Sequence, residues 1–179
     1  MNELQLGKRK IGQGHPVYFI AEIGLNHQGD AEIARKLVDI AVDAGADAVK
    51  FQKRSLRHVY RQDVLNHADR EEHSTDYTFR HIAKTELKKE DMVQLCQYAR
   101  SKGVDFLCTP WDEESLKFLE QKLDLPAYKI ASADMSNVKL LRSVASLHKP
   151  MLISTGMSFV SEIEHLVSFL GTLDTNPHY

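Results

Sequence analysis

The chain has 179 residues, of which 42% are hydrophobic and 27% are charged, and its formal net charge is −2. This composition is typical of a soluble globular domain with a sizeable core, and it excludes a strongly basic nucleic-acid-binding protein. No apolar run approaches the roughly 20 residues of a membrane span, and the N-terminal segment lacks the apolar centre of a signal peptide. We therefore expect a cytoplasmic protein without a membrane partner.

The N-terminal third begins with a short polar lead-in over residues 1–16, in which Leu4–Ile11 is expected to form a small hairpin. A strand is predicted over Val17–Ile23, which is apolar except for Glu22. After a loop, Asp30 is expected to cap a helix, because the apolar residues that follow it recur with the helical period. That apolar stripe consists of Ala31, Ala34, Leu37, Val38, Ala41 and Ala44.

Four further strand–helix units follow the first. The predicted strands are Ala46–Phe51, Val104–Thr109, Ala127–Ala131 and Met151–Thr155. The helix after the second strand carries Met92, Leu95, Cys96 and Ala99 on one face. Later helices are expected to begin at Asp112, at Ser136 or Asn137, and at a capping box formed by Ser161 and Glu164. The two cysteines, Cys96 and Cys108, are expected to be buried and reduced, because their spacing fits neither a metal site nor a redox motif.

The connection Lys53–Glu86 is too long for an ordinary loop. It contains four histidines whose spacing matches no metal site: His58, His67, His73 and His81. As the loop after the second strand, it is expected to be a solvated, partly helical lid over the catalytic face.

Strict alternation of apolar strands and helices predicts a parallel sheet buried on both faces. Two architectures fit this pattern, the doubly wound sheet and the (β/α)₈ barrel. No glycine-rich dinucleotide fingerprint follows the first strand, and polar residues cluster at strand ends as they do in barrels. We therefore predict a TIM (β/α)₈-type barrel that is truncated after about five βα units, since a closed barrel takes about 250 residues. Length alone would favour the doubly wound alternative.

Polar residues at the ends of several predicted strands are the candidates for chemistry. Two lysines, two hydroxyls and an amide suit a phosphorylated anion, and a carboxylate beside them suits proton transfer. Taken singly, each could be an ion-paired or turn residue, so the prediction depends on their coincidence. Pattern alone indicates a phosphate-binding α/β enzyme. The candidates are Glu22, Lys50, Gln52, Lys129, Ser132, Asp134, Ser154 and Thr155.

Five strings, in this order and spacing, resemble the N-acetylneuraminate (sialic acid) synthase family: AEIGLNHQGD, GADAVKFQK, FLCTPWDEES, YKIASADMSN and ISTGMS. The resemblance implies condensation of phosphoenolpyruvate with an N-acetylated amino sugar, of the N-acetylmannosamine type, to a nine-carbon sugar acid. Related family members make legionaminate, pseudaminate or spore-coat polysaccharide precursors, and these remain alternatives here.

The same resemblance implies roles for individual residues. Lys129, Ser132 and Ser154 are similar to residues that hold the phosphoenolpyruvate phosphate, with Lys50 on the same ligand, and Gln52 is similar to a residue that contacts the amino sugar. Glu22 and Asp134 resemble active-site carboxylates, although many relatives have Glu at the second position. Asn26 and His27 belong to the first string, with a structural and a catalytic role equally open.

The family also uses a divalent cation, Mn²⁺ or Mg²⁺, whose histidine ligands are expected beyond Tyr179, so no metal ligand is assigned in this chain. Residues 1–179 are thus interpreted as the N-terminal portion of the barrel domain, without the later strands and the C-terminal antifreeze-like domain. The full-length enzyme is expected to be a homodimer. The chain alone is expected to have little synthase activity, and a truncated, non-catalytic fragment remains an alternative.

Overall fold

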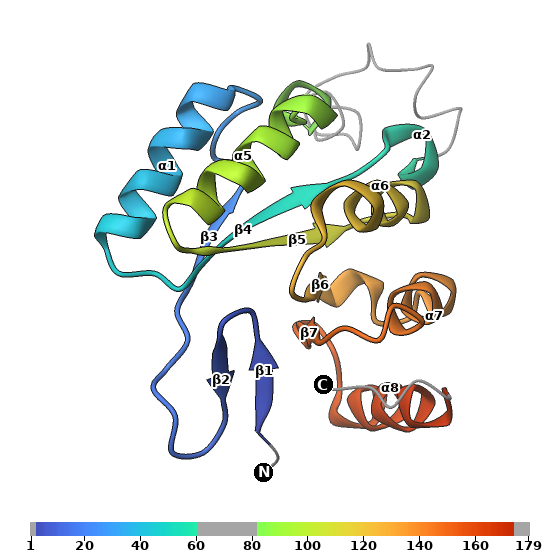
Figure 1. The fold of residues 1–179 in the computed structure, drawn as a ribbon. Helices are drawn as coiled ribbons and strands as arrows, with labels where there is room; N and C mark the ends of the chain where they lie inside the picture. Colours follow the sequence, from blue (N-terminus) through green and yellow to red (C-terminus); the bar gives the residue numbers. More distant parts are fainter. Residues whose placement is uncertain (1–2, 61–81, 174–179) are drawn as a thin grey trace.

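The computed structural model describes residues 3–60 and 82–173 of the chain. Within them, five parallel strands form one sheet in the order of the sequence (Figure 1). A doubly wound sheet reverses its strand order at a switch point, so this uninterrupted order shows that the doubly wound alternative is wrong. The sheet is an arc of a (β/α) barrel. Its strands are β3 (Ile20–Gly24), β4 (Ala48–Lys53), β5 (Asp105–Pro110), β6 (Tyr128–Ile130) and β7 (Met151–Ile153).

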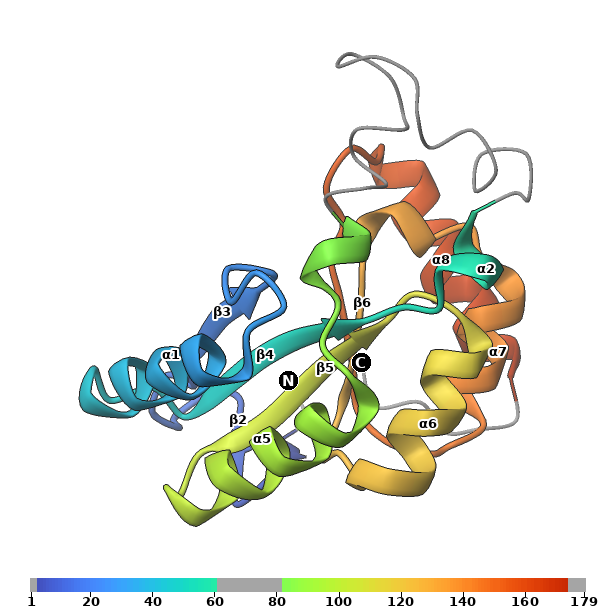
Figure 2. The same cartoon turned by 90° about the horizontal axis from the view of Figure 1, so that it is seen from above.

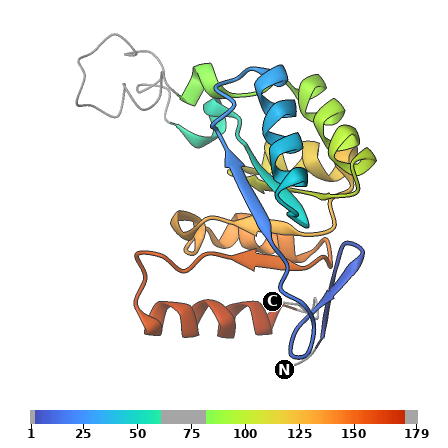
Figure 3. The ribbon, with the colours of Figure 1, turned by 90° about the vertical axis from the view of Figure 1, so that its left-hand side faces the viewer.

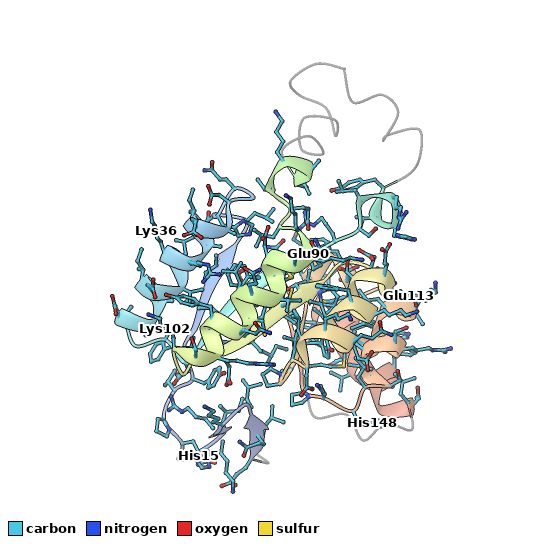
Figure 4. The ribbon with its side chains drawn as sticks, turned by 45° about the horizontal axis from the view of Figure 1, so that its top comes forward. His15, Lys36, Glu90, Lys102, Glu113 and His148 are labelled. Carbon is cyan, nitrogen blue, oxygen red and sulfur yellow. The ribbon has the colours of Figure 1, made fainter. Side chains whose placement is uncertain are left out.

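The main helices lie along the outer side of this curved sheet, and each packs against the next one in chain order (Figures 2 and 3). They are α1 (Ala31–Asp43), α5 (Lys89–Ser101), α6 (Glu113–Leu123), α7 (Val138–Ala145) and α8 (Val160–Thr172). Two short elements follow strand ends, α2 (Leu56–Val59) and the 3₁₀ turn η1 (Ser132–Asp134). Exposed charged residues such as Lys36, Glu90 and Lys102 mark the solvent side of α1 and α5 (Figure 4).

Three helices begin at the capping residues that the sequence indicates. The Asp30 carboxylate accepts hydrogen bonds from the backbone N–H groups of the first turn of α1, at 2.7 and 3.0 Å. Asp112 accepts from Ser115 N–H at 2.8 Å, and Asn137 accepts from Leu140 N–H at 3.2 Å. These side chains satisfy donors that have no partner inside the helix.

The predicted capping box at the start of α8 is wrong. The helix begins at Val160, so Ser161 and Glu164 lie inside it. Glu162 takes the capping role instead, because its side chain accepts a hydrogen bond from Phe159 N–H at 2.7 Å. The chain offers two acidic residues one turn into this helix, and the sequence pattern identified the wrong one.

The strands alternate in character between their two faces. The outward face toward the helices carries fully buried apolar residues such as Phe51 and Phe106, whose rings stack with centroids 4.9 Å apart. Cys96 and Cys108 are free and buried in this layer, as predicted. The inward positions of the same strands carry Lys50, Thr109 and Lys129, so the interior of the arc is polar toward its upper end.

The first predicted strand differs from the structure. The strand β3 begins at Ile20 instead of Val17, and Val17 and Phe19 are 68% and 62% exposed. Among the described strands β3 pairs only with β4, so its other edge has no neighbour to bury these side chains. The expectation of burial on both faces is therefore wrong at this edge. The start of β4 is also later than predicted, because Ala46 N–H still bonds to Ala41 at the end of α1.

A two-stranded antiparallel hairpin, β1 (Leu4–Leu6) and β2 (Arg9–Ile11), lies at the lower end of the arc (Figure 1). Leu6 is only 1% exposed and packs with Ala48 of β4, Leu107 of β5 and Ala127, which directly precedes β6. Gly7 adopts a positive φ of 56°, and a Cβ there would overlap the carboxylate of Asp105. The hairpin thus closes the bottom of the arc with a tight turn that requires glycine.

The predicted lid lies largely outside the described residues, together with His67, His73 and His81. His58 is described and lies on α2, where its Nδ1 is 2.8 Å from a carboxylate oxygen of Glu114. In the described part of the chain, no helix is both long and apolar enough to cross a membrane.

Candidate active site

A cavity of about 210 Å³ opens at the carboxyl ends of the strands, inside the arc. Six of its nine lining residues are predicted site residues, so the barrel brings together groups that are far apart in the sequence. We call this space the mouth cavity, and its lining residues are Glu22, Lys50, Gln52, Thr109, Trp111, Lys129, Ala131, Ser132 and Ser154.

Lys50 is the buried cation of the mouth cavity. It is 7% exposed, and its Nζ lies 2.6 Å from a carboxylate oxygen of Glu22 on the neighbouring strand. Its Nζ also donates a hydrogen bond to the hydroxyl of Thr109 at 3.4 Å. The Glu22 side chain remains 53% exposed and faces the open cavity. The pair therefore presents one protected positive charge and one accessible carboxylate to a ligand.

Lys129 supplies a second cation two strands away. Its Nζ donates to the hydroxyl of Ser154 and, at 2.7 Å, to the carbonyl of Ile130. Burial lowers the pKa of Lys129, and the positive charge of Lys50 lowers it further, whereas Glu22 opposes the shift. Two ammonium groups that disfavour each other in a partly buried site are a suitable receptor for a multiply charged anion.

Two glycines, Gly156 and Gly24, lie close to lining residues of the mouth cavity. A Cβ at Gly156 would lie 3.6 Å from the Ser132 hydroxyl, so the backbone after β7 passes close to that side chain. Gly24 has a φ of 55°, and a Cβ there would lie 3.3 Å from Glu22 Oε1 and 3.4 Å from Gln52 Nε2. The Gln52 amide nitrogen and a Glu22 carboxylate oxygen therefore both lie near Gly24, at the β3 side of the mouth cavity.

Like Thr155, which is exposed, Asp134 is a predicted site residue that the structure does not bring into the lining of the mouth cavity. It lies in η1, where Oδ1 accepts a hydrogen bond from the Asn137 amide at 3.1 Å and Oδ2 is buried without a hydrogen-bond partner among the described residues. Burial raises the pKa of Asp134, while the Asn137 hydrogen bond lowers it. The turn after β6 directs this carboxylate toward α7.

Asn26 and His27 lie in the loop after β3, outside the cavity lining. His27 is 1% exposed, its Nδ1 accepts a hydrogen bond from Gly29 N–H at 3.0 Å, and its ring stacks on Phe51. Burial lowers the pKa of His27, which favours the neutral ring that this hydrogen bond requires. These contacts give His27 a structural role in the loop.

Three lining residues were not identified from the sequence: Thr109, Trp111 and Ala131. Thr109 follows Leu107 by two positions, so strand alternation would have placed it inward once the inward face was known. Trp111 directly follows the end of β5, a position where barrel enzymes carry functional side chains, and this position could have identified it.

A larger hollow of about 750 Å³ lies between η1, α7 and α8 and shares Ser132 with the mouth cavity. Its other walls are mostly apolar, including Met157 and Phe169. Because the two inward lysines and the accessible carboxylate lie in the mouth cavity, we assign the candidate site there.

A family model described as NeuB matches residues 37–177 of this chain. This chain belongs to the NeuB family. It is 32% identical to the human N-acetylneuraminate-9-phosphate synthase over 94% of this chain and 47% of the relative. It is 37% identical to the N,N'-diacetyllegionaminic acid synthase of Legionella pneumophila, over 88% of this chain and 44% of that protein.

A crystal structure of the N-acetylneuraminic acid synthetase from Leptospira borgpetersenii, in complex with citrate, superposes with a TM-score of 0.82 at 31% identity. The match covers 98% of this chain and 57% of that one. The NeuB-family chain thus spans about half the length of the curated relatives it matches, and the arc β3–β7 corresponds to part of a TIM barrel.

The metal that the family resemblance implies finds no matching ligand set here. Across residues 3–60 and 82–173, no three His, Cys, Asp or Glu side chains are grouped so that they could hold a metal ion. The described residues therefore do not fit a metal centre.

Proposed function

We propose that this chain binds phosphoenolpyruvate in the mouth cavity and provides that half of the active site of a sugar-acid synthase. The acceptor would be an open-chain, N-acetylated amino sugar, and the products would be a 2-keto-3-deoxy sugar acid and inorganic phosphate. The observation that carries the proposal is the convergence of Lys50, Lys129 and the Ser154 hydroxyl on one cavity beside the Glu22 carboxylate.

Phosphoenolpyruvate carries a phosphate and a carboxylate, which suits two separated cations. Lys129 and the Ser154 hydroxyl, already in contact, form a donor pair for phosphate oxygens, and Ser132 adds a hydroxyl at the same rim. Lysine provides point charge and hydroxyls provide direction, which is the usual combination in phosphate sites. The ligand's negative charge would also offset the mutual repulsion of the two ammonium groups.

In the reaction, the methylene carbon of phosphoenolpyruvate forms a carbon–carbon bond with the aldehyde carbon of the sugar. The aldehyde oxygen takes up a proton, and water adds to the neighbouring, positively charged carbon of the former enol. Phosphate then leaves with the bridging oxygen, so the keto group is formed from water. The accessible carboxylate of Glu22 is placed to accept the proton of that water, with Lys50 fixing its orientation at 2.6 Å.

Calorimetric titration of the purified chain tests the first half of this proposal. Phosphoenolpyruvate and inorganic phosphate are expected to bind at one competitive site, with affinity falling as salt rises. Pyruvate, which lacks the phosphate, is expected to bind much more weakly. Binding of phosphoenolpyruvate that is unchanged in a Lys50→Met, Lys129→Met double variant would contradict the assignment of the mouth cavity.

The acceptor is tested separately with a panel of hexosamines. N-acetylmannosamine and the acetylated precursors of legionaminate-type sugars are to be titrated in the presence of phosphoenolpyruvate. We expect N-acetylated sugars to bind and the parent free amino sugars not to bind, and equal binding of both classes would contradict the proposed acceptor.

A further inference from the structure

Arg54 lies directly behind the wall of the mouth cavity and is absent from its lining. We propose that Arg54 is a positioning residue, which turns the Gln52 amide so that its NH₂ group faces the cavity and holds the Trp111 ring as a fixed wall. The site would then offer the sugar a hydrogen-bond donor, matched to an acceptor oxygen. This inference rests on the proposed function only for the identity of the ligand.

The contacts of Arg54 support this role. It follows β4 directly and is only 6% exposed. Its Nη2 donates a hydrogen bond to Gln52 Oε1, and its guanidinium carbon lies 4.6 Å from the centre of the Trp111 ring. One buried guanidinium therefore contacts two of the nine residues that line the mouth cavity.

Donor chemistry determines which way the Gln52 amide points. Arginine has only donors, so the group that faces Arg54 must be the amide oxygen of Gln52. The amide nitrogen must then point to the other side. The position of Gly24, whose Cβ would lie 3.4 Å from Gln52 Nε2, places this nitrogen at the β3 side of the mouth cavity. Without the arginine, either orientation of the amide would satisfy Gln52 equally well in contact with water.

An ion pair holds Arg54 itself in place. Its Nε lies 3.3 Å from Glu86 Oε1, and the Glu86 side chain is 12% exposed. The other oxygen of Glu86 lies 3.1 Å from Lys53 Nζ, which also donates to the Leu87 carbonyl at 2.7 Å. The guanidinium is thus fixed between Glu86 and the Trp111 ring, and a side chain confined in this way can impose an orientation on Gln52.

The structural part of the inference can be tested without any ligand. Trp111 is the single tryptophan of the chain, so its fluorescence reports directly on the ring that Arg54 covers. Arg54→Met keeps an unbranched apolar side chain but removes the guanidinium, and Arg57→Met is the matched control. The Arg57 side chain is 70% exposed and pairs with Glu114 at 3.3 Å.

In Arg54→Met we expect a shifted Trp111 emission and a displaced side-chain NH₂ signal of Gln52 in ¹⁵N NMR spectra, assigned by its loss in Gln52→Met. Arg57→Met should change neither signal. If Arg54→Met does not fold, Arg54→Lys carries the test, because lysine keeps the charge but cannot reproduce the planar contact. Native Trp111 emission and native Gln52 signals in a folded Arg54 variant would overturn the proposal.

The role of Arg54 in ligand binding is tested by comparing the affinities of its variants for the two substrates. Arg54→Met is expected to weaken binding of N-acetylmannosamine about tenfold, the usual effect of one lost hydrogen bond, and to leave phosphoenolpyruvate binding unchanged. Gln52→Met should cause the same loss, and the double variant no further loss, because both changes remove one interaction. Equal sugar affinity in the native chain and in Arg54→Met would overturn the role of Arg54 in sugar binding.

These outcomes separate the inference from the function on which it rests. If the native chain binds neither phosphoenolpyruvate nor the sugar, the proposed function fails, while the Gln52 and Trp111 signals still decide whether Arg54 positions them. If the native chain binds both ligands and Arg54→Met matches the native chain in sugar affinity and in the Gln52 and Trp111 signals, the function stands and the inference fails.

Discussion

The two ends of the strands differ in the kind of side chain that faces the interior of the arc. At the lower end, Leu6 of the hairpin fills the space between Ala48, Leu107 and Ala127, all fully buried and all apolar. At the upper end, the corresponding inward positions carry Lys50 and Lys129. One end thus contributes stability and the other holds charge where burial is unfavourable, which shows how a barrel separates folding from function.

The largest expected effect is at the lower end. Leu6→Ala removes a side chain that is 1% exposed, so it should cost about 2–5 kcal/mol in the free energy of unfolding. Denaturant titration measures this loss, and Lys8→Ala, an exposed change in the same hairpin, should cost little. The folded variant should bind phosphoenolpyruvate as the native chain does. A large loss of affinity would show that the two ends are not independent.

An intermediate effect is expected at the upper end, where a substitution should lower ligand affinity and leave stability unchanged. Lys129→Met removes the ammonium group that, together with the Ser154 hydroxyl, is proposed to bind the phosphate. Phosphoenolpyruvate binding should therefore weaken about 10- to 100-fold. Because burial lowers the pKa of Lys129, its charge is disfavoured in the folded state, and the variant should be no less stable at neutral pH. Calorimetry and thermal melts measure both properties. Lys139→Met is the control, since this exposed lysine pairs only with Glu113 among the described contacts. A Lys129→Met variant that is less stable than the native chain but binds phosphoenolpyruvate equally well would contradict the proposed difference between the two ends.

The smallest effect is expected at Asp134, which lies near the upper end but outside the mouth cavity. Asp134→Asn should leave phosphoenolpyruvate affinity within about twofold, well below the loss of one hydrogen bond. Burial raises the pKa of Asp134, so ionisation destabilises the fold as pH rises through that pKa, whereas below the ordinary aspartate pKa both states are protonated. The stability of the variant relative to the native chain should therefore increase from acid to neutral pH. Parallel denaturant titrations of both proteins across this pH range measure whether the stability difference changes in this direction. A large loss of phosphoenolpyruvate affinity in Asp134→Asn would show that Asp134 belongs to the binding site.

The sequence was informative where one physical requirement dominates. Polar residues within buried strands need a function or a partner, and this alone indicated Glu22, Lys50 and Lys129. Helix starts at Asp30 and Asp112 were predictable because each has a side chain that can satisfy the first turn. The sequence was misleading where the burial of a residue depends on the position of its strand in the sheet. Apolar residues such as Val17 and Phe19 look buried until the edge of the sheet is known.

In the candidate site, too, the sequence indicates the residue types, whereas the fold determines how their side chains are oriented. Gln52 could be recognised from its motif, but the orientation of its amide depends on Arg54, and that contact is created by the turn after β4. Asp134 has the right residue type at the right distance from β6, yet the path of η1 turns it away. Sequence reasoning therefore gave the residue types of the mouth cavity, whereas the backbone beyond the strand ends determined which side chains reach it.

Each strand from β4 to β7 hydrogen-bonds to the strand that precedes it in the sequence. During synthesis, a new strand can therefore dock on an edge that has already left the ribosome, without waiting for distant sequence. The longest interval separates β4 from β5, because the segment containing Arg54 and Glu86 must be synthesised first. Closing that loop has the largest entropic cost among the pairings of the sheet. The Lys53–Glu86 ion pair joins the end of β4 to the residues just before α5, so the contacts that surround Arg54 also close part of this loop.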